Sequence, residues 1–486
     1  MNNTQKIHGL SIVAILLIAS FSLLQSSGGG GQQIPTSFTY TITSSNTYNA
    51  YSTTSLSFTE LNFSRLMNDD IISSSQCSIS CTVFLNPGSY NLTQGIAINK
   101  PVSIYGSPSS KIISQNLTTY NAQPSCAGSF RPLFCITSSN IVFSGFSIDD
   151  HNRDNTLNVA GDDIAVGVSS SNGLIQSMTI VNASSNAINI QGSNYIVTTC
   201  TITGFHTGSG GNYGILTGST TTSVRIFLNS ISSFNGTDVS GIQTSNGASY
   251  ISITSNNLFF NSFGISSTWG KFVTIEANLI HDNYAGGMLL TTGAIGSISA
   301  GPLTINDNII TNNAKEPGLD VQCNNQHCPG IMIKGVRPSW DGVTIISNAI
   351  KDTQATPTQY YGINIISTNY SNLTITGNTL GRTVSGTTIN LGVNPLKSWI
   401  IAENPGFNPQ PIRGPLTAGA TPFTYTNNDG YKEQIELITI GDMTAFTCRG
   451  IANIIQVDAI SPILNTLDTC VFTYVTIAPT YDVLPT

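Results

Sequence analysis

The stretch Ile226-Phe227-Leu228-Asn229-Ser230-Ile231 decides the fold, because its pattern returns along the middle of the chain. In each copy an apolar residue is followed three positions later by Asn, and another apolar residue comes two positions after the Asn. The further copies are Ile253/Asn256/Leu258, Ile275/Asn278/Ile280, Ile305/Asn308/Ile310, Ile345/Asn348/Ile350 and Ile375/Asn378/Leu380. Extended in both directions, the register also places Ser144, Met178, Cys200 and Asn404 at the Asn position. The average step of about 29 residues is a repeat length typical of solenoids.

Each repeat predicts short strands and no helix. Apolar and polar residues alternate in Val224-Arg225-Ile226 and Leu373-Thr374-Ile375, as in strands that bury one face. Without crossover helices, the strands of one repeat must pair with the same strands of the next repeat, which makes an all-β parallel solenoid of roughly ten or more coils. The stacked Asn side chains are predicted to hydrogen-bond to one another and to build the fold. Cys200 at the same position is then a buried, inert thiol.

Charged residues make up 8% of the chain, against a usual share of roughly 25%. The 486 residues include 17 Lys or Arg and 24 Asp or Glu, and the formal net charge is -7. So few cations leave no basic surface for a phosphate backbone, which excludes a nucleic-acid partner. Low charge combined with 40% apolar residues also excludes a disordered chain.

The first 27 residues are predicted to be a signal peptide or a membrane anchor. The apolar stretch Leu10–Leu24 is shorter than the ~18 residues of a spanning helix, which favours cleavage. Residues 28–76 are predicted to be a Gly/Ser/Thr-rich linker and an N-terminal cap. Such a linker also suits a stalk, so a membrane tether through residues 10–24 stays open. Both alternatives place the protein outside the cytosol, secreted or at the cell surface.

Eight of the nine cysteines fall into close pairs, which predicts local disulfides in an oxidising compartment. The pairs are Cys77 with Cys81, Cys126 with Cys135, Cys323 with Cys328, and Cys448 with Cys470. A zinc site is the weaker alternative, because no Cys-x-x-Cys occurs. Seven Asn-x-Ser/Thr sequons after the leader permit glycosylation; they begin at Asn62, Asn91, Asn116, Asn182, Asn235, Asn369 and Asn372.

Two segments near the start of the solenoid, Val83–Tyr90 and Ile96–Gly106, together resemble the opening of the pectin-lyase-like superfamily. Val83–Tyr90 contains a strand and a Pro-Gly turn, and Ile96–Gly106 contains a strand that ends in Gly. The resemblance covers about residues 77–412 and implies a right-handed parallel β-helix. That fold carries lyases, hydrolases, tailspikes and adhesins, so the resemblance implies a fold and no single activity.

The catalytic signatures of this superfamily are incomplete in the chain. Asp162-Asp163 matches the paired Asp of polygalacturonase-like hydrolases, but His206 lies in Phe205-His206-Thr207 where those enzymes have Gly-His-Gly. The Asp-Pro-His-Glu motif of alginate-epimerase-like members is replaced by Asp149-Asp150-His151-Asn152.

The segment 413–486 breaks the repeat and is predicted to be a small C-terminal β-sandwich-like domain. Its alternating segments include 433–440 and 469–477, with a turn at Gly441-Asp442. Such a domain either caps the solenoid or serves attachment.

The sparse charges gather in one segment, which makes it the first candidate site. The candidate catalytic residues are Asp149, Asp150, His151, Asp162 and Asp163. Paired carboxylates suit hydrolysis or elimination on a uronate-type polymer. Asp149, Asp150 and Asp154 are alternatively candidate calcium ligands, and no other cofactor is indicated. A solvated Asp-rich turn is the third interpretation.

Other charges lie at similar offsets from the repeated Asn position, so they are predicted to line up along one turn of the solenoid. Counted from Ser144, Asp149 and Asp150 lie at offsets of five and six; the others are His206, His281, Asp282, Asp352 and Arg382. We interpret His206, His281 and Asp282 as candidate substrate-binding residues.

The longest repeat, between Asn308 and Asn348, carries a second candidate. Arg337 near Trp340 suits a sugar, because Arg pairs with planar anions and Trp stacks on rings. A disulfide-braced loop with Trp340 packed on the solenoid is the alternative.

These observations favour a secreted or surface-tethered β-helix protein that binds polysaccharide or forms part of a cell or virion surface. The alternative is a polysaccharide lyase or glycoside hydrolase that acts on a uronate-type polymer. A cell-surface glycan is the expected partner, and homo-oligomerisation stays open.

Overall fold

The computed structural model describes most of the chain from Phe38 onward. The described residues are 38–44, 48–52, 57–60, 63–78, 80–114, 131–150, 163–183, 185–206, 212–237, 239–268, 270–292, 301–316, 328–335, 341–366, 371–385, 388–391, 400–404, 413–427, 433–453, 455–456, 463–465 and 467–485. The predicted leader, with its apolar stretch 10–24, lies outside them. Among the described residues no helix is long and apolar enough to cross a membrane.

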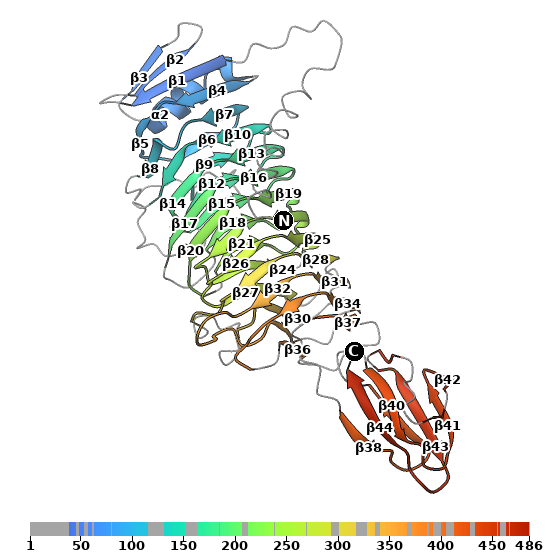
Figure 1. Cartoon of the computed structure of the whole chain (residues 1–486). Helices are drawn as coiled ribbons and strands as arrows, with labels where there is room; N and C mark the ends of the chain where they lie inside the picture. Colours follow the sequence, from blue (N-terminus) through green and yellow to red (C-terminus); the bar gives the residue numbers. More distant parts are fainter. Residues whose placement is uncertain are drawn as a thin grey trace, which may run out of the picture. The chain divides into compact units, whose positions relative to one another are not determined.

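Each coil of the chain contributes one strand to each of three parallel sheets (Figure 1). The first sheet, on the right in Figure 1, contains β4 (Cys81–Leu85), β7 (Val102–Tyr105), β10 (Ile141–Ser144), β13 (Gly173–Gln176), β16 (Tyr195–Thr198), β19 (Thr222–Phe227), β22 (Ser249–Thr254), β25 (Lys271–Glu276), β28 (Leu303–Asn306), β31 (Asp341–Ile346), β34 (Ser371–Thr376) and β37 (Ile400–Ala402). The second, on the left, contains β5 (Gly88–Leu92), β8 (Ser110–Ser114), β11 (Ser147–Asp149), β14 (Thr179–Ala183), β17 (Thr201–His206), β20 (Ser230–Phe234), β23 (Asn257–Phe259), β26 (Leu279–His281), β29 (Ile309–Thr311), β32 (Ala349–Lys351) and β35 (Thr379–Leu380).

The third sheet contains β6 (Ile96–Ile98), β9 (Arg131–Ile136), β12 (Asp163–Val168), β15 (Asn186–Ile190), β18 (Tyr213–Thr217), β21 (Ser240–Thr244), β24 (Phe263–Thr268), β27 (Gly286–Thr292), β30 (Ile331–Gly335), β33 (Ile363–Ile365) and β36 (Ile389–Leu391). Within the coils every strand pairs in parallel with the strand one repeat away, as β22 does with β25. The prediction of a right-handed parallel β-helix is confirmed.

The first coil is closed by strands and a helical segment. The strands β1 (Phe38–Ser44), β2 (Tyr48–Ser52) and β3 (Ser57–Glu60) extend the first sheet, where β1 pairs in parallel with β4 and the others are antiparallel. α2 (Phe63–Arg65) continues into a π-helical turn, Leu66–Ile72, and a 3-10 turn follows at Ser75–Ser78. The side chain of Asn68 bonds to the backbone of Gly95 and Ala97, so this segment covers the end of the core.

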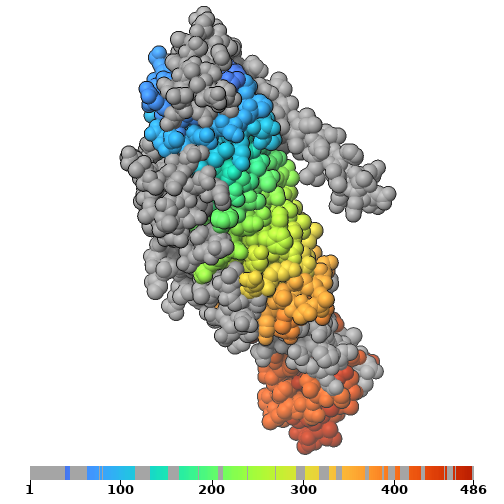
Figure 2. Space-filling model, turned by 90° about the vertical axis from the view of Figure 1, so that its left-hand side faces the viewer, coloured from blue at the N-terminus to red at the C-terminus, as the bar shows by residue number. Residues whose placement is uncertain are grey.

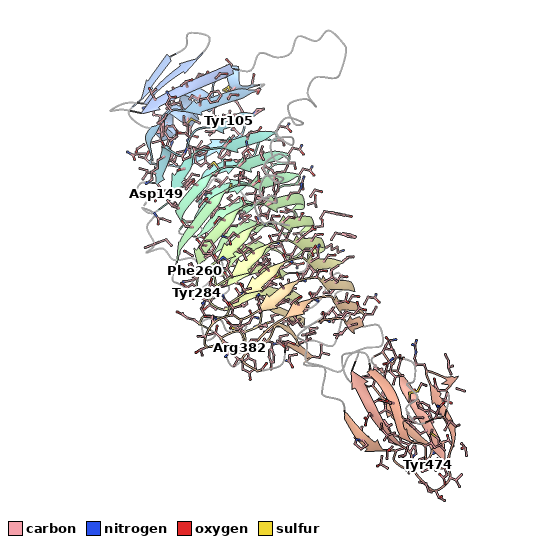
Figure 3. The ribbon with its side chains drawn as sticks, viewed as in Figure 1. Tyr105, Asp149, Phe260, Tyr284, Arg382 and Tyr474 are labelled. Atoms are coloured by element: carbon pink, nitrogen blue, oxygen red, sulfur yellow. A yellow bond between two sulfur atoms is a disulfide. The ribbon has the colours of Figure 1, made fainter. Side chains whose placement is uncertain are left out.

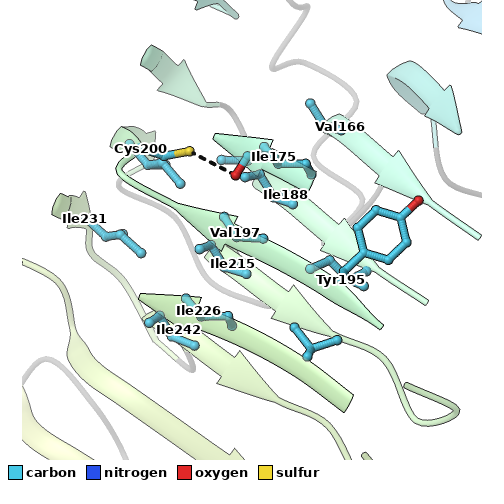
Figure 4. Packing of buried hydrophobic residues seen from close by; sticks show 14 of the residues in the cluster. Val166, Ile175, Ile188, Tyr195, Val197, Cys200, Ile215, Ile226, Ile231 and Ile242 are labelled. Carbon is cyan, nitrogen blue, oxygen red and sulfur yellow. Dashed lines mark hydrogen bonds between the residues drawn. The ribbon is translucent and has the colours of Figure 1, made fainter. Parts of the chain in front are cut away.

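Inward side chains of all three sheets form one continuous apolar core. The core runs from Tyr40 to Ile401 and is built mainly of Ile, Val and Leu. Figure 4 shows Ile175, Val197 and Ile226 stacked in consecutive coils around it. Branched side chains at matching registers interdigitate from coil to coil, because each coil repeats the position of the one before.

The predicted Asn ladder is confirmed over seven coils. In each step the side-chain Nδ2 donates to the Oδ1 of the next Asn at 2.9 to 3.0 Å, in the series Asn229, Asn256, Asn278, Asn308, Asn348, Asn378 and Asn404. Cys200 is a free, buried cysteine at the same position, and burial raises the pKa of its thiol to about 12. The inert thiol that the sequence predicts is therefore present.

One register assignment from the sequence is wrong. Ile148 pairs with Ile180, so the residue equivalent to Met178 is Phe146 and not Ser144. The error arises because Phe146 is neither Asn nor a polar substitute for it. This two-residue shift in register changes which charged residues of different coils lie beside one another.

The C-terminal segment forms two antiparallel sheets. One contains β38 (Arg413–Thr417), β44 (Thr480–Pro485) and β40 (Glu433–Thr439), and the other contains β39 (Phe423–Thr426), β43 (Thr469–Tyr474), β41 (Met443–Cys448) and β42 (Ile451–Ala452). They share a core that includes Leu437, Phe472 and Tyr481. The predicted small β domain is confirmed.

Two of the predicted disulfides lie wholly within the described residues and are formed. These are Cys77–Cys81 and Cys448–Cys470, the latter between directly paired strand positions. Cys135 and Cys328 are also disulfide-bonded. Their predicted partners, Cys126 and Cys323, lie outside the described residues.

Candidate functional site

The densest predicted cluster lies largely outside the described residues. His151, Asp154 and Asp162 belong to the segment 151–162, and Arg337 and Trp340 belong to 336–340; neither segment is described. For Asp163 and His206 the structure places the backbone, at the start of β12 and the end of β17, but not the side chain. The predicted catalytic cluster of Asp149, Asp150, His151, Asp162 and Asp163 therefore stays a prediction, and so does the calcium site.

Asp149 closes β11 on the outer surface of the second sheet. Its Oδ2 lies 2.7 Å from Nζ of Lys111, and its Oδ1 accepts a 2.9 Å hydrogen bond from Nδ2 of Asn182. Both partners come from the adjoining coils. The neighbouring Asp150 is buried. The charge of the Asp149 carboxylate is thus balanced by Lys111, and its orientation is fixed by Asn182.

Two members of the predicted row of charges, Asp149 and His281, share one row but lie far apart along the coils. Counted from Phe146, Asp149 lies at the same offset as His281, and strand pairing from β11 to β26 places both in one row. Five coils separate them, about 24 Å at the usual strand spacing. Figure 3 shows Asp149, Phe260, Tyr284 and Arg382 along one edge of the β-helix. His206 pairs with Phe234 and lies outside this row.

His281, Asp282 and Lys315 meet on this edge and form what we call the His281 cluster. Nδ1 of His281 lies 2.7 Å from Oδ2 of Asp282, and Nζ of Lys315 lies 2.9 Å from the other oxygen, Oδ1. Each side chain keeps between a quarter and a third of its surface exposed. The cluster combines one carboxylate with the ammonium group of Lys315, which can donate a further hydrogen bond to a ligand.

Residues from neighbouring coils orient the cluster. The ring of His281 stacks on Phe259 with centroids 5.3 Å apart, and its Nε2 lies 3.1 Å from Oδ1 of Asn257. Nζ of Lys315 also donates to Oε1 of Gln354 at 2.6 Å. Gln354 is itself held by the carboxylate of Asp352, which accepts from its backbone N and its side chain. The cluster therefore draws on four consecutive coils.

Exposed apolar side chains border the His281 cluster. Phe260 is 44% exposed, Leu279 is 39% exposed and Ile309 is 48% exposed. Phe260 lies within 6.4 Å of Tyr284, measured between ring centroids. Figure 2, turned toward this side of the molecule, shows the coils stacked in sequence order. Rings and apolar chains beside polar donors form a surface suited to a ligand with both apolar and hydroxyl faces.

The electrostatics of the cluster keep Asp282 ionised. Partial burial raises the pKa of its carboxyl, but the hydrogen bonds and positive charges of His281 and Lys315 outweigh this effect. The pKa of Asp282 therefore lies below its usual value. Asp282 acts as a fixed negative charge that holds the two donor groups in place. Among the described residues no group of three His, Cys, Asp or Glu side chains lies close enough to hold a metal ion.

Sequence reasoning found His281 and Asp282 but missed Lys315, Phe259 and Asn257. It also missed a second ladder, in which the side chains of Asn261, Asn283 and Asn313 bond to one another at 2.9 to 3.2 Å. Each lies five residues after an Asn of the first ladder. That constant offset was the available signal for this second ladder, which runs directly behind the edge that bears the cluster.

No family model and no curated protein matches the chain, whereas 51 solved chains match it in structure. One is DFA-IIIase from Arthrobacter chlorophenolicus A6, without its lid and in complex with GF2, with TM-score 0.50 and 13% identity over 70% of this chain and 88% of that chain. Another is the Dettilon tailspike protein gp208, with TM-score 0.51 and 12% identity over 83% and 88% of the two chains. At these identities the similarity establishes the shared β-helix fold.

Proposed function

We propose that this protein binds a polysaccharide with the edge of its β-helix that carries the His281 cluster and the bordering apolar side chains. The observation that carries the proposal is an exposed ring in the same cluster as an oriented ammonium group. Phe260 lies 5.3 Å from Phe259, which stacks on His281, and Asp282 beside His281 holds Lys315. Sugar units present C–H faces that pack on rings and hydroxyls that accept hydrogen bonds. The structural neighbours, a DFA-IIIase in complex with GF2 and a tailspike protein, agree with a polysaccharide-related role.

The cluster suits binding because its polar groups are already oriented. Lys315 is fixed by Asp282 and Gln354, and His281 is fixed by Asp282 and its stack on Phe259. Ordering these side chains costs little on binding, since protein contacts hold them beforehand. A ligand hydroxyl that meets them therefore loses less affinity to side-chain ordering.

We further propose that the protein works outside the cytosol, secreted or tethered at a cell or virion surface. The disulfide-bonded state of Cys77, Cys81, Cys448 and Cys470 supports this location, because such bonds persist in oxidising compartments. Fractionation of cells that express the full chain tests it. Recovery of the protein in the cytosol with reduced cysteines would contradict the location.

Binding of the recombinant protein to a glycan array tests the proposed function. Phe260→Ala and Lys315→Ala are each expected to weaken binding about five- to tenfold, the effect of losing one ring contact or one oriented donor. Phe84→Ala is the matched control, since Phe84 is 42% exposed but lies on the first sheet. Equal binding by all three variants would overturn the proposal.

The same glycans, incubated with the protein and read for chain cleavage, test the enzymatic alternative. Asp149 and Asp282 are too far apart to act on one glycosidic bond, because five coils separate the two residues. The predicted cluster of Asp149, Asp150, His151, Asp162 and Asp163 therefore stays the candidate for a cleavage activity. Cleavage abolished by Asp163→Asn but not by Asp282→Asn would favour a lyase or hydrolase over a pure binding protein.

A further inference from the structure

A second row of side chains, on the first sheet, contains two exposed aromatic residues. The row is formed by the residue that precedes the first inward residue of each strand. In consecutive coils these residues are Asn172, Asn194, Ser223, Tyr250, Phe272, Pro302, Gly342 and Asn372. All except Pro302 have a φ between 54° and 79°, in the left-handed region. We call this the leading row.

The leading row favours residues that tolerate the left-handed region, and two coils depart from this preference. Asn and Gly adopt this backbone readily, whereas bulky side chains do so only at a cost in free energy. Tyr250 and Phe272 nevertheless adopt φ values of 56° and 54°. Burial of the side chains does not fully offset the free-energy cost of this backbone conformation, because Tyr250 stays 58% exposed and Phe272 stays 47% exposed. Strain that persists without a packing reason points to a function.

The rings of Tyr250 and Phe272 stack on one another along the direction in which the coils stack. Their centroids lie 4.7 Å apart and their planes differ by 7°, which matches the spacing between neighbouring strands. One face of Tyr250 is covered by Phe272. The other face of Tyr250 is turned toward the preceding coil. In that coil the leading row holds only the small, exposed side chain of Ser223.

We call the position of Ser223 in the leading row, between Tyr250 and Asn194, the slot. The ring of Tyr250 bounds the slot on one side. On the other side stands Asn194, whose Nδ2 donates to Oδ1 of Asn172 at 3.0 Å. Hydroxyl groups border it along the chain, because Oγ1 of Thr222 lies 3.0 Å from Oγ of Ser193.

We propose that this slot binds one uncharged pyranose unit, stacked on the free face of Tyr250. A pyranose chair that packs its C–H face on a ring lies about one strand spacing from it, so it takes the place that a third aromatic ring would occupy. The amide of Asn194 and the hydroxyls of Thr222 and Ser193 supply its hydrogen bonds. No charged side chain belongs to the leading row, and the guanidinium of Arg225 lies over Phe227, 5.3 Å from its centroid. The site is therefore suited to a neutral sugar.

This inference shares the ligand class of the proposed function but rests on a different sheet and on different residues. The probes are neutral hexasaccharides of α- and β-linked glucose and of galactose, titrated into the full chain by calorimetry. Tyr250→Asn introduces the residue type that two other coils carry at the same position, Asn172 and Asn194. The backbone conformation is therefore retained while the ring is lost. We expect at least a tenfold loss of affinity for the bound hexasaccharide, with an unchanged or higher melting temperature.

Two further variants separate the slot from simple surface effects. Tyr250→Phe keeps the ring and is expected to bind within about twofold of the wild type. Ser223→Phe fills the slot with a ring and is expected to abolish binding at this site. Binding unchanged in Tyr250→Asn and Ser223→Phe, or no binding of any neutral hexasaccharide by the wild type, would overturn the inference. Loss in Lys315→Ala alone would support the His281 cluster and count against the slot.

Discussion

At the residue scale, the Asn ladder shows how one side chain satisfies several backbone groups. In each coil of the ladder, Nδ2 of the Asn donates hydrogen bonds to two backbone carbonyls, one two residues earlier and one in the preceding coil. For Asn278 these are the carbonyls of Glu276 and Ile253. Its Oδ1 accepts from the backbone N of Asn256. Buried polar backbone groups at this corner are therefore paired without water.

Asn278→Ala is expected to destabilise the β-helix by about 3 kcal/mol, because it leaves several buried donors and acceptors without partners. Chemical denaturation followed by circular dichroism measures the change. Asn99→Ala is the matched control, since Asn99 is exposed, and it is expected to stay within about 0.5 kcal/mol of the wild type. A small effect in Asn278→Ala would contradict the structural role of the ladder.

Cys200 occupies a ladder position with the geometry of an Asn. Its Sγ lies 3.3 Å from the carbonyl of Thr198 and 3.8 Å from that of Ile175, the two acceptors equivalent to those of Asn229. Cys200→Asn is therefore expected to stabilise the protein by about 1 kcal/mol, because a strong donor replaces a weak one. Denaturant midpoints of the two proteins decide the matter, and a loss of more than about 1 kcal/mol would show that the site cannot hold an amide.

At the scale of elements, short turns are fixed by single carboxylates. In the C-terminal domain Asp442 accepts hydrogen bonds from the backbone N of Val475, Thr476 and Ile477. Desolvation raises the pKa of this carboxyl, but these bonds and the hydroxyl of Thr476 outweigh it and lower the pKa to about 2. The turn after β40 is thus tied to the end of β43.

The depressed pKa of Asp442 makes the C-terminal domain acid-sensitive. Its folded pKa of about 2 lies below the ordinary pKa of 3.8 for an Asp carboxyl, so the stabilisation is present above pH 3.8 and is lost as the pH falls through about 2. We expect the wild type to unfold more easily as pH falls from 4 to 2, and the difference between wild type and Asp442→Asn to shrink over that range. Melting curves at these pH values measure it; a constant difference would contradict the assignment.

At the scale of the whole molecule, few ions hold the fold. Four ion pairs of described residues lie at or near the surface: Arg65–Asp69, Lys111–Asp149, Lys315–Asp282 and Arg449–Asp468. Stability comes instead from a continuous apolar core and stacked amides. Such interactions are weakly screened by salt, in contrast to surface charges.

The melting temperature is therefore expected to change by no more than a few degrees between 0.05 and 1 M sodium chloride, at neutral pH. Lys315→Ala serves as an internal comparison, since it removes one of these pairs and is expected to lower stability by less than about 1 kcal/mol. A large shift of the melting temperature with sodium chloride would show that surface charges contribute more than the structure indicates.

The β-helix, the first Asn ladder and the buried Cys200 could all be predicted from the order of the amino acids alone. Each depends on one position repeated from coil to coil, and a repeated position is visible in the sequence because parallel pairing matches like with like. The exception was Phe146, whose identity gave no sign of its register. The C-terminal β domain was visible for the opposite reason, since its strands interrupt the period.

Only the tertiary structure decided which side chains meet. Lys315 reaches Asp282 from the next coil, and Gln354 reaches Lys315 across an interval of 39 residues in the chain. The stacked rings of Tyr250 and Phe272 face one another for the same reason. Coils differ in length but stack at one strand spacing, so contacts between them depend on exact register and on loop length, which no single repeat specifies.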